Sequence, residues 1–183
     1  MKKLLVVFLL FVNTLIASGY TRPNVYVIDA GKNAFFHNNL GLRCVDEKNY
    51  SGAIQEFKIA ISLNPNTQST AVYYNNLGDA YMTIGLFKYA QDCYEKAITQ
   101  YSLNFRYYQN LAKCYKAQNL VGSKIKIYAS RQKNPLNMVM LGLLYVEKGD
   151  ISMGIVKLDE FCFKEPDLII TKAIKNYIKE LVN

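Results

Sequence analysis

A Leu-Gly pair, or its close equivalent Leu-Ala, recurs four times along this chain. The copies are Leu40-Gly41, Leu77-Gly78, Leu111-Ala112 and Leu141-Gly142, at successive spacings of 37, 34 and 30 residues. Spacing on this scale is typical of a solenoid, in which similar supersecondary units stack and each unit contacts only its neighbours. A solenoid offers a curved surface and no catalytic pocket by default. The repeat therefore indicates binding as the mechanism and leaves the bound molecule unidentified.

Within each unit, small and large residues alternate at fixed places. Residues 34–67 carry Gly41, Ala53 and Ala60 among the larger Leu40 and Phe57, and residues 71–104 repeat this arrangement. Small residues let two helices approach closely, and apolar residues three and four positions apart form a helical stripe. Polar residues, Pro or Gly interrupt the stripe at 46–49, 64–66 and 84–86, where we expect helices to end. Each unit thus predicts two helices joined by a short turn.

This pattern resembles the tetratricopeptide repeat over almost all of the chain after residue 33. The resemblance implies an all-α, right-handed α-solenoid of about four helix-turn-helix units, at 34–67, 71–104, 105–134 and 135–168. An amphipathic capping helix over 167–182 would close the stack, giving nine helices and no strands. The third unit is irregular, because Ser123 and Lys124 replace the expected small residue and Asn134-Pro135 begins the next unit early.

The first residues are typical of an export signal. Lys2-Lys3 precedes an apolar run at 4–17 and small residues at Ala17 and Gly19, so we predict a signal peptide at 1–19 and a mature chain from near Tyr20. The run is shorter than the roughly 20 apolar residues of a membrane-spanning helix. We therefore expect a periplasmic or secreted protein, with an uncleaved N-terminal membrane tether as the alternative. Residues 20–33 are predicted to be a flexible leader, or alternatively a strip packed on the first helix pair.

Positive charge is concentrated in the third unit. The chain carries a net charge of +8, and no acidic residue lies between Glu95 and Glu147. The basic residues of that window are Lys96, Arg106, Lys113, Lys116, Lys124, Lys126, Arg131 and Lys133, with tyrosines among them. Such a region can attract acidic peptides, anionic surfaces or nucleic acid. Alternatively, the cations of the second helix in this unit only solvate its outer face.

The resemblance also implies which side chains line the concave groove. The polar members are Asn38, Asn39, Asn75, Asn76, Asp79, Arg106, Gln109, Asn110, Lys113 and Lys116, and the apolar ones include Phe35, Leu42, Val45 and Val72. Side-chain amides can donate to and accept from an extended backbone of any sequence. We therefore predict a non-enzymatic adaptor or scaffold that binds a protein or peptide, favouring an acidic segment. The alternative is a binder of anionic polymers or membrane surfaces that uses the basic third unit, and nucleic acid is not favoured.

The C-terminal region contains an apolar set on the first helix of the fourth unit: Leu136, Val139, Met140 and Leu143. It is interpreted either as a docking patch for a partner or a second copy of the chain, or as core beneath the capping helix.

Catalysis is not predicted. The single histidine, His37, precedes Cys44 by two helical turns, about 10.5 Å, which is too far for the direct hydrogen bond that activates a thiol. The chain has no CxxC, HExxH, GxGxxG or phosphate-loop motif, and we expect neither a metal nor a cofactor. The four cysteines, Cys44, Cys93, Cys114 and Cys162, permit three pairings that sequence cannot separate. Cys44 and Cys114 are expected to be buried free thiols.

Overall fold

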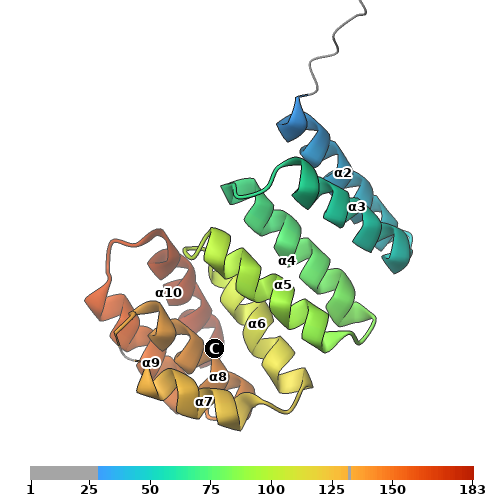
Figure 1. Ribbon diagram of the computed structural model, residues 1–183. Coiled ribbons are helices and arrows are strands. Elements are labelled where there is room, and N and C mark those ends of the chain that lie inside the picture. The colour runs from blue at the N-terminus through green and yellow to red at the C-terminus, as the bar shows by residue number, and fades with distance from the viewer. Residues whose placement is uncertain (1–28, 132) are drawn as a thin grey trace, which may run out of the picture.

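The computed structural model describes residues 29–131 and 133–183 (Figure 1). These residues form nine α-helices and no strand, which confirms the predicted all-α class. The predicted signal peptide at 1–19 and residues 20–28 of the leader lie outside the described residues. Among the described residues, no helix is both long and apolar enough to cross a membrane.

The helices follow one another as antiparallel neighbours along the stack. They are α2 (Ala30–Asp46), α3 (Tyr50–Leu63), α4 (Gln68–Thr83), α5 (Phe87–Gln100), α6 (Phe105–Ala117), α7 (Val121–Ser130), α8 (Leu136–Lys148), α9 (Ile151–Lys164) and α10 (Ile169–Val182). The even-numbered helices α2, α4, α6 and α8 contact one another from unit to unit, whereas α3, α5, α7 and α9 do not. The stack is therefore tighter on the even-numbered side, which makes that side the concave one.

One turn geometry joins the two helices of every unit. The turns contain Lys48, Gly85, Asn119 and Gly149, each with a positive φ, between 57° and 94°. The residue after each of them donates its backbone N–H to a carbonyl of the preceding helix, as Leu86 does to Tyr81 and Leu120 to Tyr115. This left-handed residue satisfies carbonyls that a helix end leaves unpaired. The turn is kept in the irregular third unit as well.

Close packing within a unit depends on the residue after the repeated leucine. A Cβ on Gly41 would lie 2.5 Å from the Phe57 ring, and a Cβ on Gly78 would lie 2.6 Å from the Tyr94 ring. Gly142 is covered by Leu158 in the same way. The helix pairs α2–α3, α4–α5 and α8–α9 accordingly make the most extensive contacts in the molecule.

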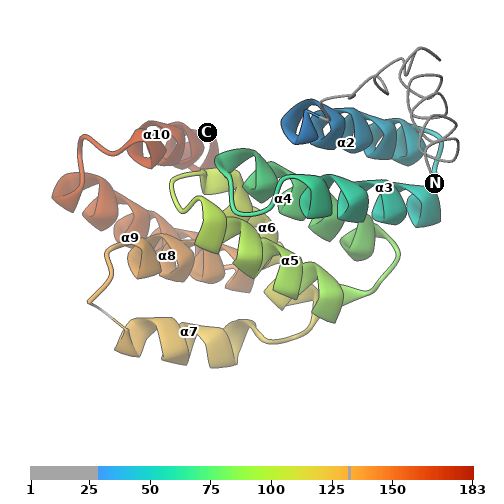
Figure 2. The same ribbon diagram turned by 45° about the horizontal axis from the view of Figure 1, so that its top comes forward.

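Helix α7 departs from this arrangement. It makes few contacts with its partner α6 and contains no buried side chain, although it packs against α8; Figure 2 shows α7 at the edge of the stack. The place that holds buried Ala53, Ala90 and Gly154 in the other units holds Lys124 here. A lysine side chain cannot fit where two backbones approach closely, so α7 is held away from α6.

The apolar set of the fourth unit belongs to the core. Val139, Met140 and Leu143 are buried in a hydrophobic cluster that runs from Ala53 to Ile174, and Leu136 packs against it. The core interpretation is confirmed for these residues, and the docking-patch alternative is wrong. The capping helix α10 packs on α9 and reaches α6, where the rings of Tyr177 and Phe105 lie 5.4 Å apart.

The cysteines and the histidine have structural surroundings. All four cysteines are free; Cys114 is buried as predicted, whereas Cys44 is only half-buried because its helix edge is less covered at this end of the stack. His37 Nδ1 lies 2.6 Å from Glu56 Oε2, so the imidazole links α2 to α3. The described residues contain no cluster of side chains arranged to hold a metal ion.

Candidate binding groove

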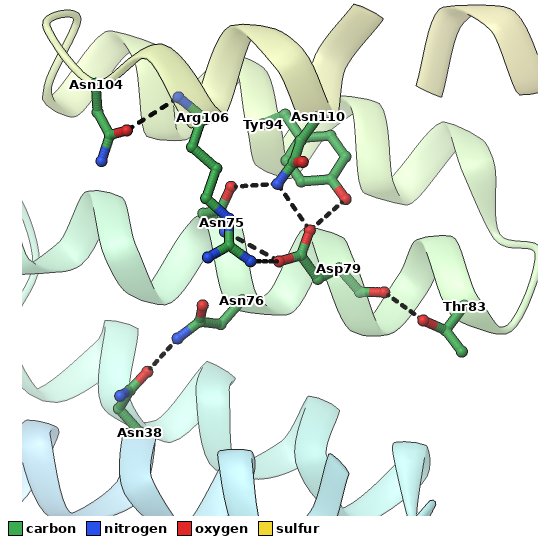
Figure 3. Close-up of polar contacts among 9 residues, drawn as sticks. All are labelled: Asn38, Asn75, Asn76, Asp79, Thr83, Tyr94, Asn104, Arg106 and Asn110. Carbon is green, nitrogen blue, oxygen red and sulfur yellow. Dashed lines mark hydrogen bonds and ion pairs between the residues drawn. The ribbon is translucent and has the colours of Figure 1, made fainter. Parts of the chain in front are cut away.

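The centre of the concave side is organised by the carboxylate of Asp79 on α4 (Figure 3). Its Oδ1 accepts from the Tyr94 hydroxyl at 2.8 Å and from Asn110 Nδ2 at 2.9 Å. Its Oδ2 accepts from Asn75 Nδ2 at 3.1 Å and from Arg106 Nη2 at 3.3 Å. Burial raises the pKa of this carboxyl, while the hydrogen bond from Tyr94 and the charge of Arg106 act in the opposite direction. One carboxylate thus ties together α4, α5 and α6.

Amide side chains also pair from one unit to the next. Asn76 Nδ2 donates to Asn38 Oδ1 at 2.9 Å, which joins α4 to α2. Asn110 Nδ2 donates to Asn75 Oδ1 at 2.9 Å, which joins α6 to α4 (Figure 3). Asn38 and Asn75 are buried, and their partners are half-buried. Five of the predicted groove residues, including Asp79, therefore form side-chain hydrogen bonds that hold adjacent units together.

The cations of the groove differ in how free they are. The side chain of Arg106 is 68 % exposed and gives Asp79 only one of its N–H groups. Lys116 Nζ pairs with Glu147 Oε2 at 3.0 Å, a contact from α6 to α8. Lys113 is exposed and forms no ion pair with any described residue, and Gln109 and Asn39 are half-buried. Arg106 and Lys113 are thus the cations best placed to meet a ligand.

An open cavity of about 410 Å³ lies beside this network, between α2 and α4. Its walls are Asn38, Leu42, Val45, Phe57, Val72, Asn76, Asp79, Ala80, Thr83 and Arg106. Leu42 and Val72, on neighbouring helices, are 41 % and 42 % exposed and both line the cavity. The cavity thus combines an apolar floor with an amide pair on one side and a guanidinium at the rim, and we call it the groove pocket.

The sequence placed these residues on one face through the repeat, and the structure brings most of them together. What sequence reasoning missed is the partner Tyr94, which comes from the second helix of its unit and reaches Asp79 between the helices. The equivalent place in the first unit holds Phe57. The hydroxyl that Tyr94 has and Phe57 lacks was the one sequence signal of this contact.

Comparison with known proteins bears on the fold. The family model described as the tetratricopeptide repeat matches residues 71–101. A tetratricopeptide repeat protein of Parabacteroides merdae is similar with a TM-score of 0.52 at 15 % identity, over 82 % of this chain and 60 % of that one. The pilF protein of Pseudomonas aeruginosa gives 0.51 at 16 %, over 81 % and 68 %.

A tetratricopeptide domain of Arabidopsis OM64 is also similar, with a TM-score of 0.49 at 14 % identity, over 82 % of this chain and 98 % of that one. A search of curated proteins finds no match to the chain. The repeat match and the two likenesses above a TM-score of 0.5 support a tetratricopeptide-like, all-α repeat fold.

Proposed function

We propose that this protein is a non-enzymatic adaptor that binds an extended segment of a partner protein along its concave side. The observation that carries the proposal is the groove pocket, where exposed Leu42 and Val72 lie beside the guanidinium of Arg106. Tetratricopeptide repeats are in general protein-interaction scaffolds, which agrees with this function.

The chemistry of the pocket defines the segment it would accept. One apolar side chain fits over Leu42, Val45 and Val72, and a neighbouring carboxylate would meet Arg106, with Lys113 further along α6. The remaining acceptor capacity of the Asn76 amide is available to a backbone N–H of the segment. We therefore favour a partner segment in which an apolar residue is followed closely by an acidic one.

Magnitudes indicate that both features are needed. A few cations that each contribute about 1 kcal/mol reach only weak affinity by themselves. Burying one apolar side chain contributes about 1.5–3 kcal/mol more, which tightens binding by roughly ten- to a hundredfold. The apolar pocket thus contributes a binding free energy comparable to that of the cations, and the cations orient the segment.

The N-terminal sequence motivates an extracytoplasmic setting for this binding. Lys2-Lys3, the apolar run at 4–17 and the small residues before Tyr20 support a periplasmic or secreted location. The alternative is a protein tethered to the membrane by an uncleaved N-terminus.

The test begins with peptides displayed on phage and selected on the protein from Tyr20 onward, at low and high salt. We expect enriched peptides that share an apolar-acidic pattern and that still bind at high salt. The variant Val72→Asp should abolish their binding, whereas Ile59→Asp should not. Ile59 is a matched control because it is 38 % exposed on α3, outside the pocket. Peptides that bind Val72→Asp as tightly as the wild type would exclude the groove pocket.

Salt separates this function from the alternative of an anionic-surface binder. Charges exposed to solvent are screened within about 8 Å at physiological ionic strength. Capture of mixed acidic material that disappears at high salt and survives Val72→Asp would contradict the adaptor proposal.

A further inference from the structure

A second cavity lies under helix α7, in the third and fourth units, whereas the groove pocket lies mainly in the first two. Its volume is about 380 Å³, and its walls come from α5, α6, α7 and α8, together with Arg131 and Asn134. It shares no residue with the groove pocket. We call it the α7 cavity; helix α7, which covers it, packs against α8 and makes few contacts with α6.

The α7 cavity results from the side chains between α6 and α7 and not from the backbone turn that joins these two helices. The turn before α7 has the same geometry as the other three, with Asn119 at a φ of 57°. The small residue of the other units is replaced by Lys124, whose Nζ lies 4.3 Å from the centre of the Tyr115 ring. A cation over an aromatic face is attracted to it. Lys124 therefore acts as a spacer that keeps α7 off α6 and is itself stabilised there.

The walls include aromatic, aliphatic and polar side chains. Tyr108, Tyr115 and Tyr128 supply three rings, and Leu111 and Met140 supply aliphatic surface. Burial raises the pKa of all three tyrosines, so their hydroxyls remain neutral hydrogen-bonding groups at ordinary pH. The volume of the cavity lies in the range of small-molecule sites. Polar side chains complete its walls: Glu95, Thr99, Lys124, Arg131, Asn134 and Asn137.

The charges around the α7 cavity do not balance. Its one acidic side chain, Glu95, accepts through Oε1 from the Tyr115 hydroxyl and from Gln91 Nε2, both at 2.9 Å. Lys124 and Arg131 also line the cavity, and neither forms an ion pair with a described residue. Two cations thus face one carboxylate whose Oε1 is already bonded, and the complementary ligand is negative.

We propose that the α7 cavity binds a small amphipathic anion, with its apolar or aromatic body among the three tyrosines and its carboxylate or sulfonate held by Lys124 and Arg131. This site goes beyond the adaptor function, since it lies outside the groove. A ligand there also contacts both α7 and the fixed helices α5, α6 and α8, so it joins α7 to the stack.

The test uses two probes on the full chain: 8-anilinonaphthalene-1-sulfonate, followed by fluorescence, and decanoate, followed by calorimetry and by displacement of the first probe. We expect one saturable site per chain and competition between the probes. Occupancy should also slow amide hydrogen exchange in Val121–Ser130, because the bound molecule closes the opening under α7.

Two neighbouring lysines give a matched pair of variants. Lys124→Ala removes a cation and restores the small residue of the other units, so α7 can close on α6 and the cavity is lost. We expect at least a tenfold loss of affinity for both probes. Lys126→Ala removes the same charge from an exposed place on the same helix that does not line the cavity, and affinity should stay within twofold.

A third variant, Arg131→Gln, should weaken decanoate binding several-fold. Because Arg131 is exposed, this change should leave the fold intact. Because 8-anilinonaphthalene-1-sulfonate also binds loosely packed protein, the thermal transition of each variant is measured by circular dichroism. Equal affinity in Lys124→Ala and the wild type, or equal losses in Lys124→Ala and Lys126→Ala, would overturn the proposal. Loss of probe binding in Val72→Asp would place the probes in the groove pocket and overturn it as well.

Discussion

Asp79 accepts hydrogen bonds from side chains of α4, α5 and α6, and its carboxylate lies where three helices meet. A carboxylate that is largely removed from water is costly unless its oxygens are bonded, and here four donors bond the half-buried Asp79. The same bonds position Arg106 at the rim of the groove pocket. At the scale of single residues, the groove is thus prepared by contacts within the protein before any ligand arrives.

Replacing Asp79 with alanine should therefore destabilise the protein strongly. The change leaves the Tyr94 hydroxyl and the Asn75 amide N–H without their acceptor and removes one of the two acceptors of Asn110 Nδ2. An unpaired buried polar group costs about 1–3 kcal/mol. We expect a loss of about 2–3 kcal/mol in the free energy of unfolding, measured by urea denaturation. Asp92→Ala removes an exposed carboxylate paired with Lys88 and should change it by less than about 0.5 kcal/mol. Equal effects of the two changes would contradict this role of Asp79.

The buried tyrosines make stability depend on alkaline pH. Burial raises the pKa of Tyr94, Tyr108 and Tyr115 above the ordinary value of 10. Once the pH exceeds 10, the unfolded chain releases these protons and the folded chain keeps them, so the free energy of unfolding falls as pH rises. Below that pH both states are protonated, and these groups add no pH dependence.

Urea denaturation between pH 8 and pH 11 measures this slope. Each tyrosine contributes at most about 1.4 kcal/mol per pH unit. Tyr115→Phe should flatten the slope above pH 10 and leave it unchanged below pH 9. A slope above pH 10 that is the same in the variant and the wild type would show that Tyr115 ionises equally in both states.

Sequence reasoning located these residues but not their bonds. The repeated amide at Asn39, Asn76 and Asn110 placed each of them on the concave side through the register of the repeat. Whether Asn110 turns to Asn75 and Asp79 or to solvent depends on the distance between units and on side-chain rotamers, which the repeat pattern does not contain. The residues of the groove could therefore be predicted from the sequence, but the hydrogen bonds among them could not.

At the scale of helices, the approach of two backbones decides how each unit packs. A Cβ on Gly154 would lie 2.5 Å from Val146 Cγ2 and 3.0 Å from the carbonyl oxygen of Gly142, so α8 and α9 would have to separate. We expect Gly154→Ala to destabilise the protein by about 1–3 kcal/mol.

Gly122 on α7 is the matched control for that substitution. It has a helical backbone, and nothing lies within 4 Å of a Cβ built on it. Gly122→Ala should stabilise the protein by about 0.5–1 kcal/mol, because alanine is the better helix former. Thermal unfolding of the two variants should thus shift in opposite directions, and a shift in the same direction would show that α8 and α9 tolerate separation.

The position of α7 relative to α6 could not be predicted from the repeat pattern. Ser123 and Lys124 marked the third unit as irregular, and the short unit before Asn134-Pro135 agreed with that. A lysine at a close-packing place can be accommodated by a shifted helix, a tilted one or an unfolded one. The ring of Tyr115, which the cation of Lys124 covers, favours the shifted helix, and this contact joins residues that a pattern along the chain treats as unrelated.

At the scale of the whole molecule, the repeat spacing predicted the all-α class and the succession of helices, because nearest-neighbour packing is local in sequence. The hydrophobic cluster runs through the stack from Ala53 on α3 to Ile174 on α10. A stack of this kind has open ends, and its terminal unit must supply a polar outer face. Helix α10 has lysines on that face and packs its other face on α9 and α6.

Removal of α10, by ending the chain at Leu168, should therefore expose core and promote self-association. Ile170 and Ile174 are fully buried, and losing them forfeits about 1.5–3 kcal/mol each, a large part of the 5–15 kcal/mol that stabilises an ordinary domain. Phe105 on α6 also loses the covering ring of Tyr177. Light scattering over a concentration series should show growing mass for the shortened chain and constant mass for the full one.

Ile174→Asp in the full chain should reproduce the loss of stability, whereas Val182→Asp, at an exposed place near the helix end, should not. A shortened chain that keeps constant mass and the melting temperature of the full one would mean that α10 contributes nothing to closing the stack.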